Sequence, residues 1–325
     1  MNRENFHNID LHLPSGWMEL TTTQLEQMAE ALLKYGKADG DDPLWKVKCH
    51  VFFRWNGLEI LSNNGKNVWM DCDGDTVVRV HREGIREDFM LNYWMVVEWI
   101  KEKLNWMNGP VKVLRFPYPT FRKRRFLSAS EYSGPDALMQ NFCYRQYRVA
   151  GEYLSYYLMM NNKLAAMRKN RQTDPFVLDR QIYEVRKAQS LVMASLYNRK
   201  VKHIDKVTGR RTASFLFIPG QSEMNRRDFE GFSDVQFQCI LLWWNSMTTW
   251  LGDRFPKVFR RKDVGRSRQT NPLDVYRQTV TVMEKYLTGM NEERVNNEMY
   301  MNVLQHLQNI LDENDRMKEL ERKSN

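Results

Sequence analysis

Apolar residues recur at three- and four-residue steps along most of this chain, and this period predicts amphipathic helices. The expected helices span residues 21–35, 44–58, 85–106, 137–161, 179–196, 232–255, 271–287 and 291–322. The first has the most complete start signal, because Thr21 can cap the helix while the side chain of Gln24 reaches back to the cap amide. So many helices place the chain in the mainly α class.

One segment has the two-residue period of strands instead. Residues 68–72 and 76–81 flank an Asp-Gly-Asp turn, and Asp-Gly accepts the positive φ of a tight hairpin turn. We therefore expect a multi-helix globular protein with one small β-hairpin near residues 68–81.

Proline content suggests how the chain is divided. Four prolines lie between residues 110 and 135, together with a basic run at residues 122–125, and this composition favours a loop. We expect an N-terminal helical region with the hairpin over residues 1–110, followed by a proline-rich basic linker over 111–136. A basic central helical region over 137–268 and a C-terminal helical pair over 269–325 complete the chain; whether these regions share one core stays open.

The net charge of +9 is concentrated in the middle of the sequence. Residues 111–268 hold 30 Lys and Arg against 13 Asp and Glu, a net charge of +17, whereas the segments before and after carry −5 and −3. A basic region between acidic ends is compatible with binding to nucleic acid or to an acidic protein, because the field attracts either polyanion.

The candidate binding residues lie in three basic segments and on one helix. In residues 115–126, rings can stack on unpaired bases while cations meet phosphates; the alternative is a loop held to the core by its aromatics. The second segment is a basic loop expected over residues 197–219. The candidates are Arg115, Tyr118, Phe121, Arg122, Lys123, Arg124, Arg125, Arg199, Lys200, Lys202, Arg210, Arg211, Trp243, Arg260, Arg261 and Lys262.

The last four of these candidates have structural alternatives. The cations at residues 260–262 follow a helix end, where they also oppose the negative end of the helix dipole. Trp243 points about 100° away from Trp244 on one helix, so we expect Trp244 in the core and Trp243 against a partner.

No catalytic or cofactor motif is present. The sequence has no H-E-x-x-H, no G-x-S-x-G and no Gly-rich phosphate loop, and its four cysteines form no C-x-x-C pair. Asp71, Asp73 and Asp75 resemble the start of a calcium loop, but Thr76 and Arg82 stand where that loop needs Gly and Glu. We expect a protein that is not an enzyme and that holds no cofactor or metal.

Hydropathy places the chain in a cytoplasm. No apolar run reaches the roughly 18 residues that cross a bilayer. The first residues lack the apolar stretch of a secretory signal. No membrane contact is expected.

Short segments in a fixed order carry a resemblance to a known family. They are Leu13, Pro14, Trp17, Glu19, Leu20, Thr21 and Gln24; the hairpin near Trp69; Glu152, Tyr153, Leu154, Tyr156 and Tyr157; Leu196 and Tyr197; Trp243 or Trp244, Trp250, Leu251, Phe255, Pro256 and Phe259; and Val303 with Leu304. Together they resemble an uncharacterised protein family encoded in prophages and phages of gut anaerobes. Members sit among tail morphogenesis genes near the tape-measure gene, which implies a tail assembly chaperone in the host bacterial cytoplasm.

The resemblance supplies the expected function. We expect a non-enzymatic phage tail assembly protein that covers a tape-measure-like partner, with exposed Met and Trp on apolar helices and basic loops on acidic ones. The long basic loops at residues 115–126 and 199–211 depart from that family. Two alternatives therefore stay open: a nucleic-acid-binding protein that uses the basic central region, and a structural virion subunit of the neck or tail.

Overall fold

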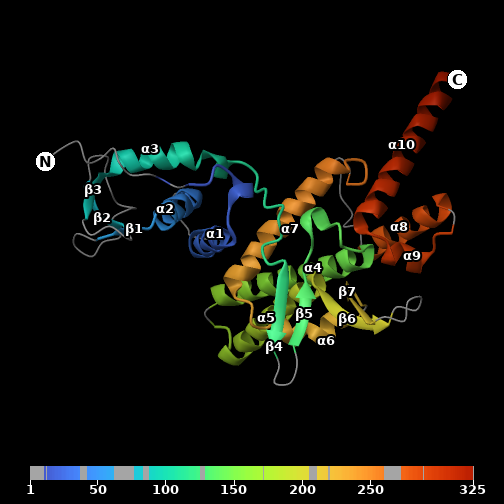
Figure 1. The fold of residues 1–325 in the computed structure, drawn as a ribbon, viewed down its shortest axis with the longest axis horizontal. Helices are drawn as coiled ribbons and strands as arrows, with labels where there is room; N and C mark the ends of the chain where they lie inside the picture. Colours follow the sequence, from blue (N-terminus) through green and yellow to red (C-terminus); the bar gives the residue numbers. More distant parts are fainter. Residues whose placement is uncertain are drawn as a thin grey trace. The chain divides into compact units, whose positions relative to one another are not determined.

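The chain is mainly α-helical, as predicted (Figure 1). The computed structural model describes residues 11–324 except 12, 37–41, 62–76, 83–87, 125–128, 171, 205–210, 219, 260–271 and 288. The chain forms two compact units, the first made of Met1–Val113 with Ser233–Ser246 and the second of Leu114–Phe232 with Met247–Asn325. The four regions expected from the sequence are a finer division and stay a prediction.

The first unit combines helices with a small antiparallel sheet of order β1-β2-β3. Its elements are α1 (Thr22–Tyr35), α2 (Pro43–Trp55), β1 (Leu58–Ile60), β2 (Val77–Arg82), β3 (Phe89–Asn92), α3 (Tyr93–Lys103) and the first part of α7 (Asp234–Arg254). The start of α1 is the predicted capping box: Thr21 Oγ1 accepts from the Gln24 N–H at 3.2 Å, and Gln24 Oε1 accepts from the Thr21 N–H at 3.0 Å.

The core of the first unit lies between its helices. Met28, Phe52 and Ile100 are fully buried there. Trp106 borders this core, stacked at 6.5 Å on Trp55, and its indole N–H donates to the Pro14 carbonyl at 2.9 Å. This hydrogen bond ties the segment before α1 to the residues that follow α3.

The sheet of the first unit differs from the predicted hairpin. Residues 62–76 lie outside the described part of the chain, so the first predicted strand and its turn are not described. The second predicted strand is β2, which pairs with β1 and β3: Val80 lies opposite both Ile60 and Phe89. The helix expected over residues 85–106 therefore begins only at Tyr93, because the apolar run of β3 suits a strand as well as a helix.

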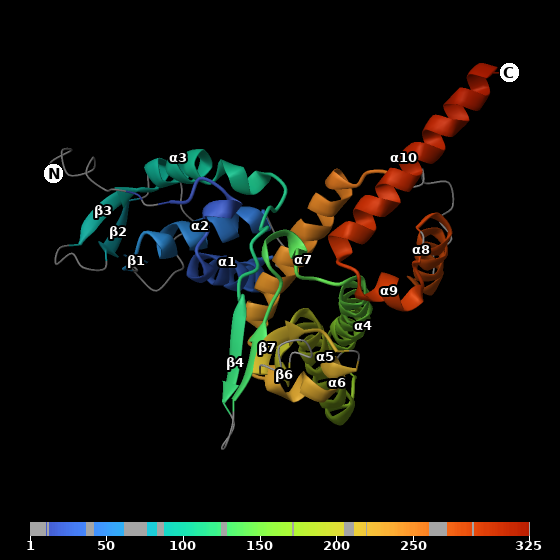
Figure 2. The same ribbon diagram turned by 45° about the vertical axis from the view of Figure 1, so that its right-hand side comes forward.

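The second unit contains the larger sheet and most of the helices. Its elements are β4 (Thr120–Arg124), β5 (Ala129–Ser133), the 3-10 turn η4 (Ala137–Met139), α4 (Tyr144–Lys169), α5 (Pro175–Leu196), β6 (Asn198–Ile204), β7 (Arg211–Leu216), α6 (Gln221–Asn225), the 3-10 turn η5 (Arg226–Phe229), the end of α7, α8 (Pro272–Tyr286), α9 (Glu292–Asn297) and α10 (Tyr300–Ser324). In both views α10 extends beyond α8 (Figures 1 and 2).

A four-stranded antiparallel sheet of order β4-β5-β6-β7 corrects the sequence prediction of a single hairpin. The linker expected over residues 111–136 contains β4 and β5, and the loop expected over 197–219 contains β6 and β7. The basic residues on these strands hid the apolar alternation that normally marks a half-buried strand.

Aromatic side chains cover one face of this sheet, and we call it the inner face. The Phe121 ring lies 5.1 Å from both Phe229 and Phe232, and Tyr132 lies 5.0 Å from Phe229. Tyr197, the residue before β6, joins the same cluster at 5.1 Å from Phe229. The sheet is therefore held by its inner face onto η5 and the residues that follow it.

The C-terminal helices attach to the start of α4 through the backbone. The Tyr144 N–H donates to the Glu298 carbonyl at 2.9 Å, and the Tyr300 N–H donates to the Phe142 carbonyl at 2.7 Å. These bonds hold the backbone at Glu298 in an extended conformation, and Met299 forms an isolated antiparallel β-bridge with Cys143. The helix expected over residues 291–322 is consequently broken into α9 and α10.

Candidate functional site

The face of the four-stranded sheet opposite the aromatic cluster is strongly basic. Successive side chains of a strand alternate between faces, so Arg122 and Arg124 share one face of β4, and Lys200 and Lys202 share one face of β6. All four are exposed, and Lys200 Nζ binds Glu131 Oε2 at 2.5 Å across the sheet. Arg122 lies opposite the same Glu131, which places both pairs of cations on this side. We call this surface the basic face.

Glu131 is the single acidic residue in the described strands β4 to β7. Its pKa is lowered, first by the hydrogen bond and charge of Lys200, with smaller effects from the charges of Arg122 and Lys202. Three cations therefore converge on one carboxylate. The ion pair itself is exposed and stabilises little, so Lys200 can exchange this partner for another anion.

The spacing of the cations follows from the sheet. Residues two apart on one strand lie about 7 Å apart, and β4 and β6 are two strand spacings, about 10 Å, from each other. The basic face thus carries two parallel rows of positive charge, one on β4 and one on β6. A polyanion with regularly spaced charges can meet several of these side chains at once.

An exposed aromatic ring lies among these cations. Phe215 of β7 pairs directly with Lys200 of β6, so both side chains share the basic face. Its ring is 42% exposed. Sequence inspection missed Phe215, because its significance depends on the register between β6 and β7.

Several predicted binding residues serve the fold instead. The Phe121 ring packs in the aromatic cluster, and the Tyr118 ring lies 6.0 Å from Phe232. The Tyr118 carbonyl also accepts a hydrogen bond from the Tyr197 hydroxyl at 2.8 Å. Neither ring is presented for stacking, which corrects that part of the prediction. Phe121 packs inward because it stands next to Arg122 in the strand, on the opposite face.

The remaining cations fall in different places. Lys123 and Arg199 are half-buried on the inner face, where Arg199 pairs with Tyr132. Arg115 is exposed before β4, and Arg211 is the first residue of β7. The predicted residues outside the described part are Arg125, Arg210, Arg260, Arg261 and Lys262.

Trp243 is fully buried, so the expectation that it faces a partner is wrong. Leu242 and Trp244, its two neighbours on α7, are buried as well. Three consecutive buried positions span about 200° of a helix. Helix α7 is therefore enclosed on more than one side at this point, and position 243 belongs to the core.

Comparison with protein-family models, with curated proteins and with solved structures finds no match for this chain. Within the described residues, no three His, Cys, Asp or Glu side chains gather as metal ligands do. In the same residues, no helix is both long and apolar enough to cross a membrane. The exposed Phe215 ring beside two rows of cations makes the basic face the strongest candidate site.

Proposed function

We propose that this protein binds single-stranded nucleic acid on the basic face. The observation that carries the proposal is the exposed Phe215 ring beside two rows of cations on one sheet face. Phosphates would meet Arg122, Arg124, Lys200 and Lys202, while an unpaired base would stack on Phe215. A single strand fits better than a duplex, because stacking on a protein ring requires a base free of its own stack.

The salt dependence of binding tests the proposal. Each phosphate contact with a single strand contributes about 0.7 to the slope of log affinity against log salt. The double variant Lys200→Gln/Lys202→Gln should reduce that slope by about 1.4 and lower the affinity at least about tenfold. The measurement is fluorescence anisotropy of a labelled single-stranded oligonucleotide over a range of salt concentrations.

A matched control distinguishes the effect of the basic face on binding from the effect of the overall net charge. Lys163 of α4 and Arg180 of α5 are exposed, and neither has an ion pair among the described residues. Lys163→Gln/Arg180→Gln removes the same charge and should leave the slope nearly unchanged. Equal losses in both double variants would show attraction by the overall charge and would overturn the assignment to this face.

Phe215 supplies a second arm of the test. Phe215→Leu keeps an apolar side chain of similar size but removes the ring. Stacking contributes about 1–3 kcal/mol per base, so this variant should weaken binding without changing the salt slope. An acidic protein partner would need the cations but no stacking ring, so that outcome also distinguishes the two polyanions.

The expected role in phage tail assembly is a second candidate, supported by exposed apolar side chains on the second unit. These are Leu158 and Met159 of α4, Phe176, Val177 and Tyr183 of α5, and Met224 of α6. Such side chains suit an apolar helix of a partner. Together with the resemblance, they are the support for a chaperone that covers a tape-measure-like protein.

Mass spectrometry of purified phage particles beside the lysate tests this second candidate. A chaperone should be found in the lysate and not in the particles, and it should co-purify with an acidic helical tail protein in co-expression. Stoichiometric presence in the particles would instead support a neck or tail subunit.

A further inference from the structure

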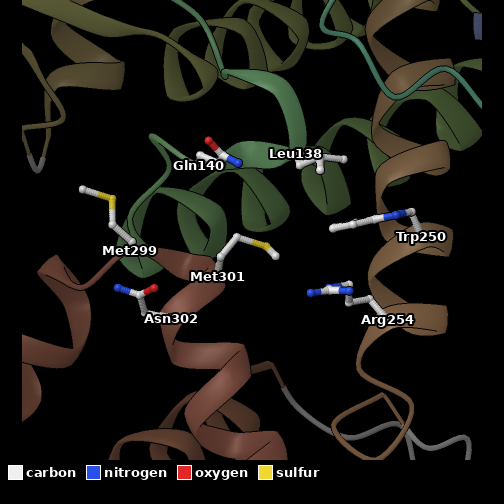
Figure 3. Close-up of a pocket in the computed structure, with 7 residues that line it drawn as sticks. All are labelled: Leu138, Gln140, Trp250, Arg254, Met299, Met301 and Asn302. Atoms are coloured by element: carbon white, nitrogen blue, oxygen red, sulfur yellow. The ribbon is translucent and has the colours of Figure 1, made fainter.

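The second unit contains a pocket of about 530 Å³ that the basic face does not use (Figure 3). Three segments line it: the end of α7, the η4 turn with the residue after it, and the start of α10. The lining residues are Leu138, Gln140, Trp250, Arg254, Met299, Met301 and Asn302. Its volume lies within the range of small-molecule sites.

One wall carries an indole and a guanidinium side by side. Trp250 and Arg254 stand four residues apart on α7, so they share a helix face. Figure 3 shows both side chains projecting from α7 to the same side. Trp250 is half-buried and Arg254 is exposed, and in the described part of the chain the Arg254 guanidinium has neither an ion pair nor a hydrogen bond. A planar group on the indole would therefore place an attached anion near an uncommitted cation.

The other walls are apolar and adaptable. Leu138 lies on one side, and Met299 and Met301 lie on another. Met299 is 44% exposed although it is apolar. Thioether side chains adapt to the shape of a ring and make favourable contacts with aromatic groups. The pocket thus suits a flat, partly apolar body.

Two carboxamides add hydrogen-bonding capacity. Among the described residues the side-chain carboxamide of Gln140 has no hydrogen-bond partner. Its N–H donors and its oxygen acceptor therefore both remain available. Asn302 donates from Nδ2 to Glu298 Oε1 at 2.6 Å, and this donation leaves its Oδ1 to accept. Carboxamides are the side chains that match the paired donors and acceptors of base edges. None of the seven lining residues is acidic, so an anion meets no opposing charge from the lining itself.

The backbone of one lining segment holds an uncommon conformation. Leu138 and Met139 have φ values of 59° and 57°, both in the left-handed region that residues other than glycine rarely adopt. Strained backbone of this kind clusters at sites where a ligand is held. Here it positions Leu138 and Gln140, which both line the pocket.

We infer that this pocket binds a nucleoside monophosphate unit. The base lies on Trp250 against the methionines, Gln140 and Asn302 contact its edge, and Arg254 binds the phosphate. The unit comes either from a free mononucleotide or from the phosphorylated end of a nucleic acid strand. None of these residues belongs to the basic face, so this inference and the proposed function can fail separately.

Calorimetric titration of the full chain with mononucleotides tests the inference. A nucleoside monophosphate should bind at least about tenfold more tightly than the matching nucleoside or inorganic phosphate alone, because only it engages both Trp250 and Arg254. Arg254→Gln should abolish that preference while keeping the affinity for the nucleoside. Arg180→Gln removes another exposed arginine, which does not line the pocket, and should change nothing.

Trp250→Phe keeps an aromatic ring of smaller area and should weaken nucleoside and nucleotide alike. No binding of any mononucleotide at millimolar concentration, or equal binding of nucleotide and nucleoside in the wild type, would overturn the inference. Tighter binding of benzoate than of the mononucleotides would also overturn it, because it would assign the pocket to aromatic carboxylates.

Competition distinguishes the two sources of the nucleotide. If the pocket holds a strand end, an oligonucleotide with a 5′ phosphate should displace a labelled mononucleotide, and the same oligonucleotide without that phosphate should not. The displacement should survive Lys200→Gln/Lys202→Gln, since those residues lie on the basic face. If neither oligonucleotide competes while the mononucleotides bind, the ligand is a free nucleotide.

Discussion

The hydroxyl of Tyr132 donates a 2.6 Å hydrogen bond to Oδ2 of Asp228, and both side chains are buried. Tyr132 lies in β5, whereas Asp228 lies in η5, 96 residues further along the chain. The bond fixes the middle of the sheet onto the aromatic cluster. Because Tyr132 points inward, its neighbour Glu131 points to the basic face.

Removing this hydroxyl should destabilise the second unit. A hydrogen bond to a charged group contributes about 1.5–3 kcal/mol, so Tyr132→Phe should lower the free energy of unfolding by that amount. Tyr183→Phe is the matched control, since Tyr183 is 55% exposed and its loss should change stability by less than about 0.5 kcal/mol. Chemical denaturation at neutral pH measures both; equal effects would remove the special role of Tyr132.

The same pair predicts a loss of stability at alkaline pH. Burial, together with the hydrogen bond and the negative charge of Asp228, raises the pKa of Tyr132 to about 12. The folded pKa lies above the ordinary value near 10. The stabilisation is therefore complete below about pH 10 and is lost as the pH rises towards 12.

The difference between wild type and Tyr132→Phe measures this effect directly. Burial also raises the pKa of Tyr197, but that contribution is common to both proteins. The stability gap should be constant from about pH 7 to 9 and should narrow above about pH 10. A gap that is unchanged at about pH 11 would contradict the assignment.

Glu131→Gln should strengthen binding to a single strand. The substitution removes the one carboxylate among the cations of the basic face and frees Lys200 from its ion pair. One surface charge interaction near 1 kcal/mol corresponds to about a fivefold rise in affinity. Glu319→Gln, on the exposed side of α10, changes the net charge equally and serves as the control. If Glu131→Gln weakened binding, the single-stranded nucleic acid would bind outside the basic face.

Gly134→Ala should destabilise the turn after β5. An added Cβ would clash with Cε1 of Phe116, a ring that is 3% exposed and cannot move freely. Overpacking of this kind costs about 1–3 kcal/mol. Gly151→Ala is the contrast: that glycine lies inside α4 with no atom within 4 Å of the new Cβ, so alanine should add up to about 1 kcal/mol. The thermal unfolding midpoints of the two variants should shift in opposite directions from that of the wild type.

Thr21→Ala should weaken α1. The loss of the capping hydrogen bond to the Gln24 N–H costs about 1 kcal/mol. Thr23 lies two residues later and is exposed. Thr23→Ala leaves the cap intact and should therefore have a smaller effect on the stability of α1. Amide hydrogen exchange in the first turn of α1 reads this change locally.

Prediction from the sequence is most accurate for features that depend on residues close together in the chain. The capping box of α1 depends on four consecutive positions, and the pattern of residues 21–24 identified it. The four-stranded sheet depends on pairing between β5 and β6, where Tyr132 meets Arg199 across a long separation. No local pattern reveals that register, so the sequence predicts basic loops where these strands lie.

The candidate site was predicted in the same uneven way. The charges of Arg122, Lys200 and Lys202 were found from composition alone. Their arrangement was not, because it follows from the alternation of the strands. Trp243 shows the opposite error, since a hydrophobic side chain on a helix can face solvent or core, and only the packing around α7 decides.

The position of α7 in the sequence also affects the order in which parts of the protein can be completed during synthesis. Ser246 Oγ accepts from the Val113 N–H at 3.0 Å and lies 3.1 Å from the Val111 carbonyl, so the first unit needs a segment made long after its other parts. All four strands of the larger sheet precede residue 233. On the ribosome, the sheet that carries the basic face can therefore emerge completely while the first unit still lacks its last helical segment. The unit that begins the sequence therefore cannot be completed until residues 233–246 have been made.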